Sequence, residues 1–248
     1  MGILNRFRKK KQIKIDPIRP GQKLPEIDVD VVVGSAAVKD DDETAATIHE
    51  VVGGSGTNLL IGMPGAYTPT CSESHMPGYL KAVDKLQKLG VDTIAVVTTN
   101  DKFVNDAWAK DLGIVDSSDA EKASSESPIT VLADGDGDLV QQLGLVEDMG
   151  YGIGVRSKRF VMILEDGVVS RIETDEGMYT CENTRADNII KILTPEGTSL
   201  DAEGANMGAV GLGALLLVGA AIAFGMNGGD SGSTASDGMS LLQQFGTN

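Results

Sequence analysis

The hydrophobic positions in the first three quarters of the chain predict strands that alternate with helices. Residues 27–33 begin with apolar side chains at every second position, which is the pattern of a strand with one buried face. Residues 57–63 and 91–98 are nearly continuous apolar runs, which are typical of strands buried on both faces. Apolar side chains at helical spacing predict helices at 72–90, 101–112 and 183–193.

The second half of this region adds shorter elements. Residues 129–133 predict a short strand and residues 139–145 a helical turn. Residues 159–165 and 168–172 are joined by an Asp-Gly pair, which is a strong hairpin signal. Together the elements predict an α/β fold with a mixed sheet between helices, and thioredoxin-like folds are built this way.

The C-terminal pattern is different. Residues 207–226 contain no charged side chain over 20 positions, which is the length of a helix that crosses a bilayer. Residues 194–206 contain Pro, Gly and acids and predict a linker, and the Gly/Ser-rich residues 227–248 predict a disordered tail. We therefore expect a transmembrane helix at 207–226 that serves as a tail anchor.

Charge divides the chain of 248 residues, with its net charge of −15, into three parts. Residues 1–20 carry seven basic side chains and one acidic, residues 21–193 carry 14 basic and 30 acidic, and residues 194–248 carry five acidic and none basic. The acidic body at 21–193 argues against a nucleic acid as partner, because phosphates would be repelled. The leader at 1–20 predicts a basic disordered arm, and an amphipathic organelle presequence is the alternative.

Cys71 lies in a local pattern that suits a reactive thiol. Pro64 ends the strand at 57–63, and the Thr-Pro pair at Thr68 predicts the start of a helix. Cys71 would then lie in the first helical turn, where free N–H groups and the helix dipole favour a thiolate. A buried structural cysteine is the alternative, and the presence of one other cysteine, Cys181, does not decide between the two.

The same stretch resembles the signature of the peroxiredoxins, P-x-x-x-T-x-x-C, which is matched by Pro64, Thr68 and Cys71. The wider run PGAYTPTCSESHMPGY is similar to the type-5 (redoxin) subfamily almost residue for residue. Segments at 100–108, 132–137 and 156–169 also resemble that subfamily. The resemblance covers residues 20–193 and implies a thioredoxin-like fold with a mixed central sheet flanked by helices.

This resemblance implies a cysteine peroxidase that requires no metal or organic cofactor. Cys71 would be the peroxidatic thiolate, which attacks a peroxide oxygen and becomes a sulfenic acid. Thr68 would hydrogen-bond the thiolate and the peroxide, and Arg159 would stabilise negative charge as the O–O bond breaks. Pro64 would shield the site, and the backbone N–H groups of Thr70 and Cys71 would complete the cradle for the peroxide.

The residues by themselves leave simpler roles open. Thr68 is also explained as a helix cap, and Arg159 as a surface ion-pair residue. His75 lies one helical turn beyond Cys71, but its spacing indicates a structural or interface role, and we do not include it in the catalytic set.

Cys181 determines how the enzyme would be reduced. Its Thr-Cys context is similar to the resolving cysteine of animal-type members, so the resemblance implies an intramolecular disulfide between Cys71 and Cys181. A one-cysteine enzyme with Cys181 as a spectator is the alternative. The substrates would be hydrogen peroxide and organic hydroperoxides, the reductant would be thioredoxin or a glutaredoxin–glutathione system, and a homodimer is the family expectation.

Two alternatives concern the whole protein. A non-catalytic thioredoxin-fold module, acting as a redox sensor or a membrane-tethered interaction domain, competes with the peroxidase. For location, we expect a single-pass, tail-anchored protein whose catalytic domain faces the cytosol, and the alternative is a soluble organelle protein formed after removal of a presequence.

Overall fold

The computed structural model describes residues 15–33, 45–115, 128–150 and 152–195. The predicted transmembrane helix at 207–226, the disordered tail at 227–248 and most of the basic arm lie outside these residues. Within the described ranges, no helix is both long enough and apolar enough to cross a membrane. The tail anchor therefore stays a prediction.

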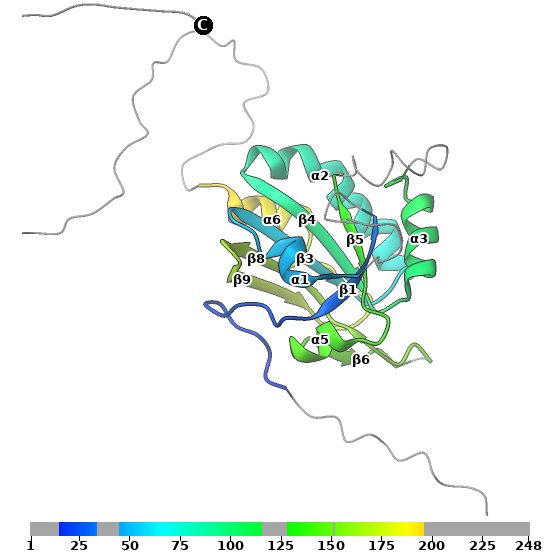
Figure 1. Ribbon diagram of the computed structural model, residues 1–248. Coiled ribbons are helices and arrows are strands. Elements are labelled where there is room, and N and C mark those ends of the chain that lie inside the picture. Colours follow the sequence, from blue (N-terminus) through cyan, green and yellow to red (C-terminus); the bar gives the residue numbers. More distant parts are fainter. Residues whose placement is uncertain (1–14, 34–44, 116–127, 151, 196–248) are drawn as a thin grey trace, which may run out of the picture. The chain divides into compact units, whose positions relative to one another are not determined.

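Seven strands form one mixed sheet in the order β2-β1-β5-β4-β3-β8-β9 (Figure 1). Their bounds are β1 Asp28–Val33, β2 Ala45–Thr47, β3 Thr57–Met63, β4 Val91–Thr98, β5 Thr130–Ala133, β8 Arg159–Glu165 and β9 Val168–Asp175. Strands β3, β4 and β5 run parallel, and the remaining neighbours are antiparallel. The strands β6 Val146–Asp148 and β7 Val155–Ser157 form a separate antiparallel pair. The predicted mixed sheet is confirmed.

The apolar strands bury side chains on both faces of the sheet, which creates two cores. In β3, Leu59, Ile61 and Met63 face one core while Leu60 faces the other, because successive side chains of a strand point to opposite sides. The helices are α1 Ile48–Val52, α2 Met76–Lys88, α3 Lys102–Asp111, α5 Asp138–Gln142 and α6 Ala186–Leu193. Side chains of α2, α3 and α6 enter the first core, and those of α1 and α5 enter the second. Figure 1 shows α2 above the sheet and α5 below it.

Strands β3 and β8 approach each other closely at one glycine. Gly62 is paired with Phe160, and a Cβ atom at Gly62 would overlap the Phe160 ring. Arg159 precedes Phe160 at the start of β8, so the two side chains point to opposite faces of the sheet. The missing side chain at Gly62 thus leaves room for the Phe160 ring in the second core, while the Arg159 side chain lies on the opposite face of the sheet.

The structure differs from the sequence prediction in several places. The predicted helix at 72–90 consists of a π-helical turn, η1 Thr70–His75, followed by α2. In α3 the apolar residue Phe103 is 76% exposed, whereas the polar residue Asn105 is buried beside Trp108 on the inward face. Asn105 can be buried because its amide donates to Leu132 O and its Oδ1 accepts from Thr98. The elements β2, α1 and the β6–β7 pair were not predicted, because each is too short to show a period.

The domain also makes contacts before the boundary that we predicted after residue 20. The Ile18 N–H donates to Leu143 O at 2.9 Å, and the Ile18 side chain packs against the second core. The domain therefore includes Ile18, which lies within the predicted 1–20 arm.

Candidate active site

Cys71 lies at the end of the parallel strands, in the turn that follows β3. The first backbone bond of this turn joins the Ser72 N–H to Thr68 O at 3.0 Å, so the N–H groups of Thr70 and Cys71 precede it along the chain. The Met76 N–H donates to Cys71 O, five residues back, which makes the turn π-helical. Extra-wide turns of this kind occur at functional sites. The Cys71 side chain is fully buried, at 0% exposed.

Arg159 brings a positive charge to the Cys71 sulfur. Its Nη1 donates to Cys71 Sγ at 3.3 Å, and the whole residue is 0% exposed. The other donors reach backbone carbonyls: Nη2 donates to Met178 O and Nε to Thr180 O, both at 2.9 Å. A buried cation is costly unless a negative charge lies nearby. Among the groups that Arg159 contacts by these bonds, the sulfur is the only side-chain atom, so the buried guanidinium places its positive charge directly beside Cys71 Sγ.

His75 is a buried, neutral neighbour of Arg159. Thr184 O can only accept, so His75 Nε2 donates to it at 3.0 Å, and Nδ1 is left to accept from Arg159 Nη1 at 2.9 Å. Burial and the nearby charge of Arg159 lower the pKa of His75 from 6.5 to about 4. A histidine that accepts from a guanidinium is not available as a base for Cys71. This geometry agrees with leaving His75 out of the catalytic set.

Thr68 and Pro64 lie in the loop that leads into η1. Thr68 Oγ1 donates to Gly65 O at 2.9 Å, and no side-chain capping bond is formed at the start of η1. The expectation that the Thr68 side chain caps the helix is therefore wrong, because its hydroxyl closes the loop instead. Pro64 is buried at the end of β3. The Ala66 N–H donates to Asn100 Oδ1 at 2.9 Å, which ties this loop to the end of β4.

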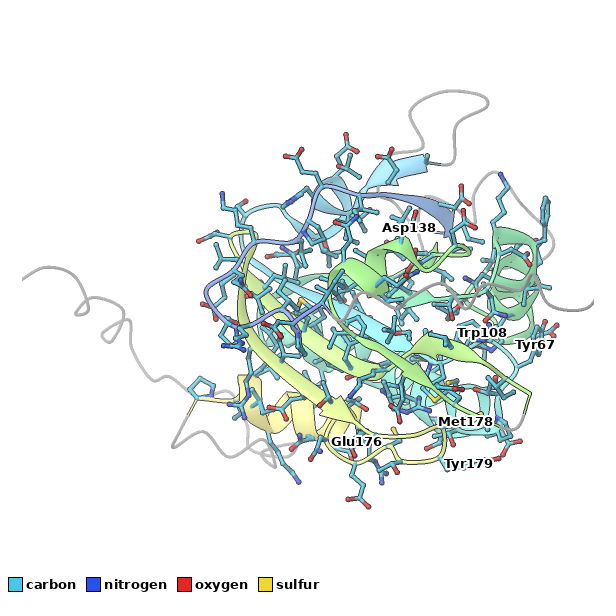
Figure 2. All side chains as sticks on the ribbon, turned by 90° about the horizontal axis from the view of Figure 1, so that it is seen from below. Tyr67, Trp108, Asp138, Glu176, Met178 and Tyr179 are labelled. Carbon is cyan, nitrogen blue, oxygen red and sulfur yellow. The ribbon has the colours of Figure 1, made fainter. Side chains whose placement is uncertain are left out.

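Two further contacts hold this region against α3. Trp108 Nε1 donates to Ser72 Oγ at 2.9 Å, directly after Cys71. Tyr67 has a left-handed backbone with φ of 59°, which is unusual for a bulky residue, and its hydroxyl donates to Asp111 Oδ2 at 2.8 Å. The hydrogen bond to Asp111 raises the pKa of Tyr67. Figure 2 labels Tyr67 and Trp108.

Cys181 lies in the segment between β9 and α6, which we call the 178–184 loop. Both cysteines are free thiols, and Cys181 is half-buried. Its Sγ lies 3.9 Å from Thr184 Oγ1, and burial raises the pKa of its thiol. Within this loop the Met178 side chain is buried, while the Tyr179 side chain is exposed (Figure 2). Cys181 is therefore placed as a protonated thiol rather than as a ready nucleophile.

An open groove of about 530 Å³ connects the two cysteine-bearing segments. It is lined by Pro69, Thr70, Glu73 and Ser74 from the η1 side, and by Tyr179, Thr180, Cys181, Glu182 and Arg185 from the loop side. A molecule in this groove would contact the Cys181 segment and the residue next to Cys71. Among the described residues, no cluster of three or more His, Cys, Asp or Glu side chains is arranged to hold a metal ion.

Asp175 holds the 178–184 loop in place. Its carboxylate accepts from the N–H groups of Glu182, Asn183 and Thr184 at 3.0–3.1 Å, and from Thr184 Oγ1 at 2.6 Å. Burial acts against the charge of Asp175, but these hydrogen bonds outweigh it and lower the pKa of the carboxyl. Sequence reasoning missed Asp175 and Thr184, because nothing in the local pattern shows that they fold back on each other.

Comparisons with known proteins agree on one family. The Redoxin family matches residues 19–190 of the chain. The chain is 35% identical over 180 residues to "Peroxiredoxin-2E, chloroplastic" from Arabidopsis thaliana, and the match covers 71% of this chain and 69% of that relative. It is 33% identical over 181 residues to "Hybrid peroxiredoxin hyPrx5" from Haemophilus influenzae, covering 71% and 66%. Among solved structures, reduced Prx3 from Vibrio vulnificus matches with a TM-score of 0.56 and 32% identity, covering 71% of this chain and 98% of that chain.

Proposed function

The chain belongs to the redoxin family, and on this premise we propose that Cys71 is the thiol that reacts with the peroxide. The activity is that of its peroxiredoxin relatives, so the chain is a thiol-dependent peroxidase. The observation that carries the assignment of Cys71 is the 3.3 Å hydrogen bond from the buried Arg159 guanidinium to its sulfur. The Cys181 sulfur, by contrast, is 3.9 Å from the Thr184 hydroxyl, and Arg159 acts on it through its charge without a hydrogen bond to the sulfur.

The first half-reaction oxidises Cys71. Its thiolate attacks one oxygen of a hydroperoxide ROOH, so that an S–O bond forms as the O–O bond breaks. Cys71 becomes a sulfenic acid, and the second oxygen leaves as RO⁻, which takes a proton from solvent to give water or an alcohol. Arg159 and the backbone N–H groups of Thr70 and Cys71 are the donors that stabilise the charge on the breaking bond.

Thr68 and Pro64 complete the proposed substrate site. Because Thr68 Oγ1 donates its proton to Gly65 O, its lone pairs remain to accept from the O–H of a peroxide. This arrangement supports the role that we expect for Thr68 as a substrate-binding residue. Pro64 is buried beside this loop and would keep bulk water away from the sulfur.

In the second half-reaction we propose Cys181 as the resolving thiol, as in the type-5 subfamily. Its sulfur attacks the sulfenic sulfur of Cys71, so that an S–S bond forms and water leaves. The support for this pairing is that Arg159 bonds both to Cys71 and to Thr180 O, the residue before Cys181. Thioredoxin or a glutaredoxin–glutathione system then supplies the two electrons that reduce the disulfide, and the open groove beside Cys181 gives such a thiol access.

Location and assembly are proposals that rest on the sequence and the relatives. The uncharged run at 207–226 supports a tail anchor with the catalytic domain on the cytosolic side. The chloroplastic name of one relative supports the alternative, in which the basic leader is an organelle presequence. Deletion of residues 206–248 should release the protein from carbonate-washed membranes, and an intact protein that never sediments with membranes would refute the anchor. The homodimer follows from the family alone, and sedimentation of the purified chain tests it.

Two cysteine variants test the mechanism. Cys71→Ser should abolish peroxide consumption with dithiothreitol as reductant, because Cys71 carries the sulfur that accepts the Arg159 hydrogen bond. Cys181→Ser should retain the reaction with dithiothreitol but lose the intramolecular disulfide seen by peptide mapping after peroxide treatment. If Cys71→Ser consumed peroxide at the wild-type rate, the proposed site would be wrong. If wild type gave no disulfide between the two cysteines, the one-cysteine alternative would replace the resolving role of Cys181.

A further inference from the structure

A continuous series of hydrogen bonds connects the 178–184 loop to the Cys71 sulfur. It begins at Asp175, which is 3% exposed and holds Thr184 through both its N–H and its hydroxyl. These two bonds hold the N–H group and the side chain of Thr184, and its carbonyl, in the next peptide unit, follows directly from this anchored residue. Thr184 is itself 0% exposed, so water does not compete for these groups.

The Thr184 carbonyl then holds two residues on the opposite side of the site. It accepts from His75 Nε2 at 3.0 Å and from the Tyr79 hydroxyl at 2.8 Å. The rings of His75 and Tyr79 also meet edge to face, with centroids 5.4 Å apart. The carbonyl thus fixes the proton of His75 on Nε2 and leaves Nδ1 as an acceptor.

The last link reaches the reactive sulfur. Arg159 Nη1 donates both to His75 Nδ1 at 2.9 Å and to Cys71 Sγ at 3.3 Å. The remaining bonds of the guanidinium go to carbonyls of the same 178–184 loop. Every polar group that orients Arg159, apart from the sulfur, therefore either belongs to this loop or is held by it.

We propose that Asp175 and Thr184 are positioning residues for the peroxide step, and that the folded 178–184 loop is a working part of the Cys71 site. The proposal rests on the assignment of Cys71 as the peroxide-reactive thiol. In the folded loop, the Met178 and Thr180 carbonyls and the His75 ring together hold Arg159 on the sulfur.

A purely structural role for Asp175 would give a different result. If it only anchored the loop, loss of its bonds would change resolution by Cys181 and leave the first reaction of Cys71 unchanged. The test therefore uses a Cys181→Ser background, in which only the peroxide step takes place. Trp108 is the only tryptophan of the chain, and it donates to Ser72 Oγ beside Cys71, so its fluorescence in stopped flow follows that step.

Thr184→Val and Asp175→Asn should each slow the reaction of Cys71 with hydrogen peroxide by about tenfold, which corresponds to about 1.4 kcal/mol of transition-state stabilisation. Thr184→Ser keeps the hydroxyl and should restore the rate to within about twofold. Glu182→Gln is the matched control, because it changes an exposed side chain of the same loop and keeps the backbone bond to Asp175. Its rate should equal that of the background.

A second readout separates positioning from unfolding. Alkylation of Cys71 by iodoacetamide at neutral pH should slow in Thr184→Val in the same ratio as the peroxide reaction, while the near-ultraviolet circular dichroism spectrum stays unchanged. The proposal would be overturned if Thr184→Val and Asp175→Asn both reacted as fast as the Cys181→Ser parent. It would also be overturned if Thr184→Ser were as slow as Thr184→Val. Neither result would affect the assignment of Cys71, which depends on the separate loss of activity in Cys71→Ser.

Discussion

The two cysteines of this chain have opposite environments. Cys71 is fully buried on a helical turn, with a guanidinium 3.3 Å from its sulfur. Cys181 is half-buried in a loop, its sulfur lies 3.9 Å from a hydroxyl, and burial raises the pKa of its thiol. The thiol that we propose as the nucleophile is thus the less accessible of the two. Since the thiolate is the reactive form, a buried cation in contact with the sulfur matters more than exposure to solvent.

The largest effect should come from removing that cation. Arg159→Met keeps the length of the side chain and removes the charge, and the reaction of Cys71 with hydrogen peroxide should slow by about 10²–10³-fold, the usual cost of a donor that stabilises transition-state charge. Stopped-flow fluorescence measures the rate. Arg156→Met is the matched control, because the Arg156 guanidinium bonds to Ile153 O and Thr99 O rather than to the sulfur. A rate for Arg159→Met within about threefold of wild type would mean that the Arg159 charge does not account for the reactivity of Cys71.

A smaller effect concerns how the Cys71 pocket responds to acid. The pKa of His75 is lowered from 6.5 to about 4, so between these values the unfolded chain takes up a proton that the folded chain does not. The neutral, buried His75 therefore stabilises the folded chain fully above pH 6.5, and this stabilisation is lost as the pH falls toward 4. The loss amounts to about 3 kcal/mol of unfolding free energy.

Urea unfolding at several pH values measures this loss. The difference between wild type and His75→Gln should decrease over that interval, because the variant has no imidazole to protonate. The same substitution at His49, the other histidine, is the control. An unchanged difference from pH 7 to pH 4 would mean that His75 is protonated as easily in the folded chain as in the unfolded one.

The smallest effect should arise on the Cys181 side. The Glu147 carboxylate accepts from the Gly177 N–H at 3.1 and 3.3 Å, just before the 178–184 loop. Glu147→Gln keeps an acceptor but removes the charge, which should loosen the loop by about 0.5–1 kcal/mol and change the rate of disulfide formation by about two- to fivefold. Quenched samples analysed for the disulfide give that rate. The rate of the first reaction of Cys71 is the internal control, and a larger change in that rate than in disulfide formation would contradict the prediction.

Strong local signals explain what the sequence could predict. The strands at Thr57–Met63 and Arg159–Glu165 were predicted with their observed bounds, because each is an apolar run ended by a turn signal. The buried position of Asn105 in α3 was not predicted. An inward asparagine looks unfavourable in sequence, and only the tertiary structure shows that Leu132 O and Thr98 satisfy the Asn105 amide.

The same limit applies to the site. Cys71, Thr68 and Arg159 were found because they match a signature, and the structure brings Arg159 onto Cys71 from 88 positions away. Asp175 and Thr184 belong to no signature, and their role depends on a loop that folds back on a strand end. For Thr68 the alternative role as a helix cap is wrong, because its hydroxyl donates to Gly65 O and closes the loop.

The absence of a side chain at Gly62 has a consequence for anyone who wishes to alter this enzyme by directed evolution. Any larger residue there must displace the Phe160 ring, and Phe160 follows the arginine that supports the reactive sulfur. Libraries that vary position 62 alone should therefore yield inactive clones, whereas paired libraries that shrink residue 160 at the same time open new sequence space. Substitutions of Gly62 and Phe160 in the core on one face of the sheet would thus be selected by their effect on the Cys71 reaction on the opposite face.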